Sequence, residues 1–216
     1  MKEAILYIKL ANDRVQCVAC NHRCVIEEGS KGICFVRQNF EGKLYTLNYG
    51  KTIGLNIDPI EKKPLYHFLP GTKTYSFAAP GCNFRCAWCQ NWEIAQSPRI
   101  SKVIEGVEIS PVEYVTRALE AECPSISYTY TEPTVFVEYA LETMIIAKES
   151  KLKNVWVTNG YMSREALAVI TPYLDAANVD LKGSDDATYE EFCGGKIKPI
   201  MENLQFMHKE GIHLEI

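Results

Sequence analysis

Three cysteines stand close together in the stretch GCNFRCAWC, which covers residues 81–89. Their CxxxCxxC spacing groups Cys82, Cys86 and Cys89, and no fourth cysteine follows closely. Three thiolates can each bind one iron of a 4Fe-4S cubane and leave the fourth iron open to an outside ligand. A structural zinc site would instead need a fourth donor, such as His67 or a remote cysteine. The spacing favours the open cluster, and therefore a site for chemistry.

A second group of cysteines lies near the start of the chain. Cys17, Cys20, Cys24 and Cys34 follow the spacing C-x2-C-x3-C-x9-C. Four thiols can complete a tetrahedron around a structural zinc ion, and they can also hold an auxiliary iron-sulfur centre. We favour zinc because nothing in the spacing selects iron, and disulfides are a third alternative. His22 could replace one thiol, although we expect it to be a surface neighbour.

The composition is that of a protein with one sizeable core and little affinity for nucleic acid. The chain has 216 residues, of which 47% are hydrophobic and 23% are charged. Its net charge of -4 gives no basic surplus, so a nucleic-acid partner is not expected. Early charges exclude a signal-peptide core, and no apolar run reaches the roughly 18 residues of a membrane span. We predict a cytoplasmic protein whose nine cysteines serve metal or redox chemistry.

The chain changes character near residue 71. Residues 1–70 hold the four-cysteine group and then two alternating stretches that meet at Gly50, a pattern that predicts a β-hairpin. Three prolines within residues 58–71 predict an extended connector. We therefore divide the protein into an N-terminal cysteine-rich segment over 1–70 and a core over 71–216.

Within the core, short apolar runs alternate with stretches of helical periodicity. The predicted strands cover residues 74–79, 125–130, 154–159, 176–181 and 212–216. Ser110 and Ser163 are typical helix N-caps, and Gly211 would end a helix over 198–210. Nearly unbroken apolar strands separated by helices are typical of parallel sheets. The pattern predicts an α/β fold, either an open sheet or a β/α barrel.

The cysteine motif directly follows the first of these strands, where a barrel would place its active site. With aromatic Trp88 before its last cysteine, the motif resembles that of the radical S-adenosylmethionine superfamily. This resemblance implies a partial (β/α)6 TIM-like barrel with a 4Fe-4S cluster whose free iron binds S-adenosylmethionine. Reductive cleavage of that cofactor would give a 5′-deoxyadenosyl radical that abstracts hydrogen from a substrate.

A narrower likeness covers nearly the whole chain. The stretches DPIEKKPLYHFLPG, APGCNFRCAWCQN, SYTYTEPT, VTNGY and VDLKG resemble the AmmeMemoRadiSam-system enzymes, relatives of the pyruvate formate-lyase-activating enzymes. The resemblance names no reaction. It implies an electron donor and an unknown substrate, either a small molecule or a protein, and glycyl-radical activation is one candidate. The alternatives are a non-catalytic iron-sulfur electron-transfer or metal-stabilised interaction module and a tRNA-modifying enzyme, which the charge balance disfavours.

The resemblance also assigns roles to residues after the second strand. Thr131 and Glu132 stand where the superfamily has a Gly-Gly-Glu-type segment that receives the methionine amino group, so Glu132 is expected to accept a hydrogen bond from that ammonium. The resemblance also implies backbone pairing of the cofactor over residues 129–131, although the glycines of the superfamily segment are absent here. The alternative for Glu132 is an acid in the first turn of a helix.

Four further residues are expected at the same site. The resemblance places Asn159 against the cofactor ribose or carboxylate, although Asn159 also begins an ordinary Asn-Gly turn pair. Asp180 and Lys182 share one face of the fourth strand and are expected to contact the cofactor or the substrate; the alternative is a mutual salt bridge. Trp88 is expected to pack over the cluster, or else in the core.

Two further expectations concern the lone cysteines and the end of the chain. Cys123 and Cys193 are predicted to be inert buried thiols, with Cys193 the better placed of the two to line a substrate entrance. The superfamily's barrel has six strands, yet we count five before the chain ends. Without a sixth strand the sheet would have an unpaired edge. Either dimerisation or the N-terminal hairpin covers that edge, or the chain is a truncated form.

Overall fold

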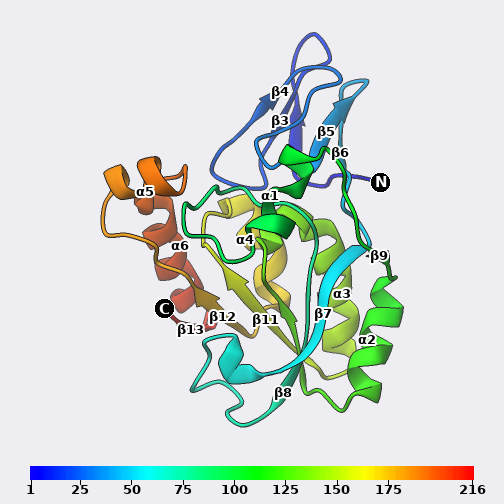
Figure 1. The fold of residues 1–216 in the computed structure, drawn as a ribbon, viewed down its shortest axis with the longest axis vertical. Helices are drawn as coiled ribbons and strands as arrows, with labels where there is room; N and C mark the ends of the chain where they lie inside the picture. Colours follow the sequence, from blue (N-terminus) through cyan, green and yellow to red (C-terminus); the bar gives the residue numbers. More distant parts are fainter.

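A seven-stranded sheet forms the central layer of the protein in a computed structural model that describes all 216 residues (Figure 1). Its strand order is β13-β12-β11-β10-β8-β7-β9. Five neighbouring strands are parallel: β8 (Lys73–Ala78), β10 (Ser125–Tyr128), β11 (Lys153–Thr158), β12 (Ala176–Val179) and β13 (His213–Glu215). These are the five predicted strands. The α/β class is confirmed, and the partial barrel remains a prediction.

Helices connect the parallel strands, and two of them begin at the predicted serine caps. The α-helices are α1 (Trp92–Ile100), α2 (Pro111–Glu120), α3 (Val137–Glu149), α4 (Arg164–Ile170), α5 (Asp186–Phe192) and α6 (Ile197–Lys209). The Ser110 and Ser163 hydroxyls accept backbone N–H bonds from Glu113 at 3.2 Å and Ala166 at 3.0 Å, so both caps are confirmed. None of these helices has the length and apolar character needed to cross a bilayer.

The predicted hairpin around Gly50 is wrong. The structure instead forms a hairpin between β5 (Arg37–Phe40) and β6 (Lys43–Thr46), and β1 (Lys2–Glu3) pairs with β6. The turn between them is Glu41-Gly42, where φ is 50° and 69°, the positive values that a two-residue type I′ turn requires. Alternation of side chains predicts a strand but does not identify its partner.

Strand β7 (Lys51–Pro59) follows Gly50 and joins the central sheet instead. It pairs antiparallel with β8 and with the short strand β9 (Val107–Glu108). The sheet therefore extends across the boundary that we placed at residue 71.

The cysteine-rich segment forms a layer at one end of the central sheet, next to α1 (Figure 1). Its own sheet contains β2 (Tyr7–Lys9), β3 (Val15–Cys17) and β4 (Val25–Ile26). One hydrophobic cluster includes residues of this segment and of the central sheet. A buried ion pair between Arg37 and Glu138 of α3, with N–O distances of 3.0 and 2.7 Å, joins the two layers.

The connector over residues 58–71 is not simply extended. It contains a 3-10 turn, η1 (Ile60–Lys62), and two further such turns, η2 (Pro133–Phe136) and η3 (Thr171–Tyr173), occur later in the chain. The backbone N–H groups of Tyr66 and His67 donate to the Glu215 carboxylate at 2.8 and 2.9 Å. The connector is therefore tied to the last strand of the sheet.

Candidate functional site

The cysteine loop begins where β8 ends, at a position that only glycine suits. Gly81 has a φ of 107°, and a Cβ atom there would lie 2.8 Å from a Val36 methyl group. This turn directs the following residues over the carboxyl ends of the parallel strands. Cys82, Cys86 and Cys89 all line a cavity of about 580 Å³ at this end, a volume suited to a small-molecule ligand.

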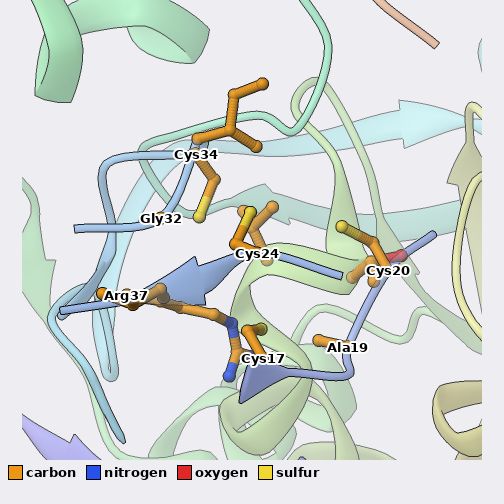
Figure 2. Close-up of a pocket in the computed structure, with 11 residues that line it drawn as sticks. Cys17, Ala19, Cys20, Cys24, Gly32, Cys34 and Arg37 are labelled. Carbon is orange, nitrogen blue, oxygen red and sulfur yellow. The ribbon is translucent and has the colours of Figure 1, made fainter. Parts of the chain in front are cut away.

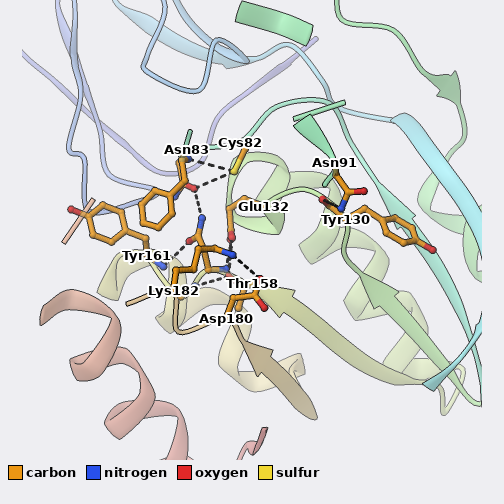
Figure 3. A network of polar contacts seen from close by, with 12 residues as sticks. Cys82, Asn83, Asn91, Tyr130, Glu132, Thr158, Tyr161, Asp180 and Lys182 are labelled. Carbon is orange, nitrogen blue, oxygen red and sulfur yellow. Dashed lines mark hydrogen bonds and ion pairs between the residues drawn. The ribbon is translucent and has the colours of Figure 1, made fainter. Parts of the chain in front are cut away.

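The same cavity collects polar residues from the next three strands. The residues predicted for the cluster and the cofactor that line it are Cys82, Cys86, Trp88, Cys89, Thr131, Glu132, Asn159, Asp180 and Lys182. Figure 3 shows several of them facing one another across the ends of the strands. The structure therefore brings together every residue that we predicted for this site, although it does not by itself assign their roles.

The three thiols line the cavity without converging on one point. Nowhere in the chain do three His, Cys, Asp or Glu side chains converge closely enough to form a ready metal site. Burial raises the pKa of the Cys82 thiol, and it raises that of Cys86 to about 12, while the Lys182 ammonium acts in the opposite direction on Cys86. The backbone N–H of Phe84 donates to the Cys82 sulfur at 3.4 Å. Three thiols on one roomy cavity match the donor set of an open iron-sulfur cluster.

Glu132 ties the ends of β10 and β11 together. Its carboxylate is 1% exposed and accepts hydrogen bonds from the Thr134 hydroxyl at 2.5 Å, the Thr158 hydroxyl at 2.8 Å and the Asn159 backbone at 2.8 Å. Burial raises the pKa of this carboxyl, and these donors oppose that rise. Glu132 thus fixes the shape of the cavity wall, in addition to lining the cavity.

Asn159 connects the third strand to the cysteine loop. Its side-chain amide donates to the Asn83 side-chain oxygen at 2.7 Å, and its own oxygen accepts from the Tyr161 backbone at 2.9 Å. Sequence reasoning missed Asn83. Its only signal was its place inside the cysteine loop, because the partner Asn159 lies far away in the sequence.

Asp180 and Lys182 pair with each other at 3.0 Å, which is the salt bridge considered as the alternative. Both also line the cavity. Leu181 between them is 42% exposed, so the segment has already left the strand pattern that we used to place it. Burial would lower the pKa of Lys182, but the Asp180 carboxylate and the nearby Cys86 and Cys193 raise it, which keeps a cation beside the cysteine loop.

Trp88 is a surface residue of the cavity entrance. Its side chain is 51% exposed and lies against Phe192, with 5.7 Å between the ring centroids. The alternative that it packs in the core is therefore wrong. An exposed indole at the mouth of a cavity is placed to contact a ligand that enters there.

A second polar group at the cavity was missed by sequence reasoning. Lys62 and Tyr130 line it, and both bind the buried Asp58, Lys62 at 2.9 Å and Tyr130 through its hydroxyl. Lys63 also contacts Asp58, at 2.5 Å. Burial would raise the pKa of Asp58, but these three donors hold it well below its usual range. The adjacent lysines Lys62 and Lys63 were the feature of the sequence that could have indicated this polar group.

The other histidine and cysteine candidates lie outside the cavity. His67 is exposed and contacts Glu215, so it is not a fourth ligand for the cysteine loop. His22 contacts the Asn83 carbonyl at 2.9 Å. Cys123 and Cys193 are buried, as predicted. Cys193 lies next to Cys86 but does not line the cavity, and its carbonyl accepts the Arg85 N–H at 2.8 Å.

The N-terminal cysteines gather around a second cavity. Cys17, Cys20, Cys24 and Cys34 line a single small cavity that is separate from the larger one. All four are free thiols, so the disulfide alternative is not found in this structure.

Comparison with known proteins identifies a family. The sequence profile described as "Radical SAM superfamily" matches residues 77–216. The uncharacterised protein MJ0808 of Methanocaldococcus jannaschii is 45% identical over 216 residues, which is 100% of this chain and 63% of that protein. A 7-carboxy-7-deazaguanine synthase of Thermococcus kodakarensis is 30% identical over 146 residues, 61% of this chain and 57% of that enzyme. The chain thus spans about three-fifths of each of these relatives.

Two solved structures align with parts of this chain. Streptococcus suis SuiB bound to its precursor peptide SuiA gives a TM-score of 0.48 at 15% identity and covers 63% of this chain and 30% of SuiB. TYW1 with a lysine-pyruvate adduct gives a TM-score of 0.38 at 17% identity over 61% of this chain and 50% of TYW1. Membership of the family rests on the profile match.

Proposed function

Because the chain belongs to the radical SAM superfamily, and is therefore an enzyme of that class, we propose that its larger cavity holds a 4Fe-4S cluster with S-adenosylmethionine beside it. One observation carries the proposal. The three cysteines of the CxxxCxxC motif line the same cavity as the polar ends of β10, β11 and β12. No fourth cysteine lines that cavity, which leaves one iron available to an outside ligand.

The proposal assigns a role to the residues on each side of the cavity. The three thiolates would hold three irons, and Lys182 would offset part of their negative charge from beside Cys86. Glu132 is already bonded to Thr158 and Asn159, so it shapes the edge that receives the methionine part of the cofactor. When bound, the cofactors supply a carbon radical that removes hydrogen from the substrate. The protein positions the reactants and limits access of water.

The finer proposal is that the substrate is a protein segment, as in the glycyl-radical-activating enzymes that the chain resembles. Trp88 at the cavity entrance, nearby Trp92 at the start of α1 and Phe192 against Trp88 are 51%, 53% and 38% exposed. Exposed aromatic side chains are common in surfaces that bind proteins. An external electron donor would reduce the cluster.

Reconstitution under anaerobic conditions tests the radical chemistry. Protein loaded with iron and sulfide, reduced with dithionite and given S-adenosylmethionine is expected to release 5′-deoxyadenosine. Cys86→Ala abolishes the release, whereas Cys123→Ala, which removes a buried thiol outside both cysteine groups, retains it. Intact S-adenosylmethionine together with a normal cluster spectrum would instead identify a passive electron-transfer or interaction module.

Fractionated extract from the native cell tests the finer proposal. Ultrafiltration separates the extract into protein and small-molecule fractions, and each is added to the reconstituted enzyme. A protein substrate increases 5′-deoxyadenosine formation only with the retained, protease-sensitive fraction. Stimulation by the filtrate alone would contradict a protein substrate and leave the radical chemistry intact.

A further inference from the structure

The four N-terminal cysteines, Cys17, Cys20, Cys24 and Cys34, surround one small enclosed space, which we call the four-cysteine site (Figure 2). Three of the four are buried. None lines the larger cavity, so the proposed radical chemistry does not use them. Four thiols that line one small space, three of them buried, need an explanation beyond packing.

Backbone N–H groups near three of the four sulfurs favour the thiolate. Burial raises the pKa of the Cys17, Cys20 and Cys34 thiols, and the N–H groups of Ala19, His22 and Val36 oppose that rise. In each case the donor lies two residues after the cysteine. Such donors stabilise the thiolate, which is the form that binds metal ions. The same arrangement, Phe84 to Cys82, occurs in the iron-sulfur loop.

The size of the space favours one of the two metal alternatives. Its volume is about 10 Å³, close to the least room that can hold one water molecule. A single ion needs no more room than this, whereas a cubane of four irons and four sulfides would require the site to widen. Zinc binds four cysteine thiolates in a tetrahedron with Zn–S distances of about 2.3 Å.

We propose that the four-cysteine site binds one zinc ion, and that this ion holds residues 18–23 against the loops of the larger cavity. The thiols surround the space without yet converging, so binding requires rotation about their Cα–Cβ bonds. Such rotation is available within the turns that carry the cysteines. Binding of the ion to the four thiolates would release the thiol protons.

Contacts from residues 18–23 explain why such an ion matters to the catalytic cavity. The Asn21 amide donates to the Met162 carbonyl at 2.7 Å, and the Ser163 hydroxyl donates to the Val18 carbonyl at 2.5 Å. His22 bonds to the carbonyl of Asn83. Met162 and Ser163 follow shortly after Asn159, so the segment supports both the cysteine loop and the end of β11. Without the ion these supports would become mobile.

Metal analysis of the full chain tests the site independently of radical chemistry. A Cys82→Ala, Cys86→Ala, Cys89→Ala variant removes the iron-binding loop, and it is expected to retain one zinc per chain and no iron. Adding Cys20→Ser to this variant abolishes zinc binding, whereas adding Cys123→Ser does not. Iron in place of zinc, or no metal at all, would overturn the proposal.

Two further measurements keep the test decisive if Cys20→Ser fails to fold. Cobalt replacing zinc in the triple variant should give the absorption bands of a tetrahedral tetrathiolate site, and their absence would contradict the assignment. Removal of zinc by a chelator should speed hydrogen exchange of the Asn21 and Ser163 amides, which bond to Tyr161 and Ala19, by about tenfold or more. Unchanged exchange after zinc loss would overturn the supporting role.

Discussion

The two cysteine groups of this protein differ in the space around them more than in their spacing. The four-cysteine site encloses about 10 Å³ and is lined mostly by apolar side chains. The three cysteines after β8 open into about 580 Å³ shared with carboxylate, amide and ammonium groups. A closed set of four thiols suits a structural ion, and an open set of three suits a reacting cofactor. The difference in accessible volume is therefore in line with the different metal groups proposed for the two sites.

The largest expected effect concerns the buried ion pair that joins the cysteine-rich layer to the central layer. Arg37→Met removes the partner of Glu138, and both side chains are at most 2% exposed. A carboxylate left buried without its partner should lower the free energy of unfolding by about 3–5 kcal/mol, measured by urea denaturation. Arg117→Met breaks an exposed pair with Glu113 and should cost about 0.5 kcal/mol or less. Equal losses would mean that the layers are not held by this pair.

The second-largest effect is expected at the wall of the larger cavity, which we call the open site. Glu132→Gln places an amide where the Thr134 and Asn159 N–H groups need an acceptor. We expect a loss of about 1–3 kcal/mol in unfolding free energy, because one buried donor loses its partner. Weaker binding of S-adenosylmethionine should accompany this loss, measured by titration of the reconstituted protein. Unchanged zinc content would confine the effect to the open site, and zinc loss would contradict the separation of the two sites.

A pH effect is expected at Glu215, where the connector meets the last strand, and Glu215 lines neither cysteine site. Burial would raise the pKa of Glu215, but bonds from the Tyr66 and His67 backbone and from the His213 and His67 side chains lower it to about 2. A lowered folded-state pKa stabilises the protein above the unfolded value of 4.5, and this gain is lost as pH falls from 4.5 towards 2.

Urea denaturation at several pH values measures this gain as the difference between the native protein and Glu215→Gln. The difference should be about 1 kcal/mol at neutral pH and should vanish in acid. A difference that grows as the pH falls would contradict the assignment.

The smallest effect on stability is expected at the entrance of the open site. Trp88→Ala removes a half-exposed ring, so the free energy of unfolding should change by only about 0.5 kcal/mol. The Michaelis constant for substrate should rise nonetheless. If Trp88→Ala instead destabilised the protein as much as Glu132→Gln, the indole would be a packing residue.

Local features were predictable because they depend on neighbours in sequence. Ser110 and Ser163 cap helices through bonds to residues three positions later. The five parallel strands were recognisable because both faces are covered, which makes their sequences nearly continuously apolar. The cysteine loop was recognisable from its own spacing and from the strand before it.

Contacts between distant segments were not predictable in this way. The alternation in residues 51–59 indicated a strand, but only the free edge of β8 determines that β7 pairs there. The bond between Asn83 and Asn159 joins residues that no periodicity connects. Asp58, Lys62 and Tyr130 formed a group only when the connector packed against the sheet. Polar networks of this kind are fixed by tertiary packing, so sequence patterns miss them.

The central claim is that an open iron coordination position faces the cavity lined by Glu132 and Asn159. Electron-nuclear double resonance of the reduced, reconstituted protein tests it with S-adenosylmethionine labelled with ¹⁵N at the amino group and ¹³C at the carboxylate. The account predicts hyperfine coupling of both labels to the cluster. A normal reduced cluster with no coupling to either label, or coupling to a fourth protein donor, would contradict it.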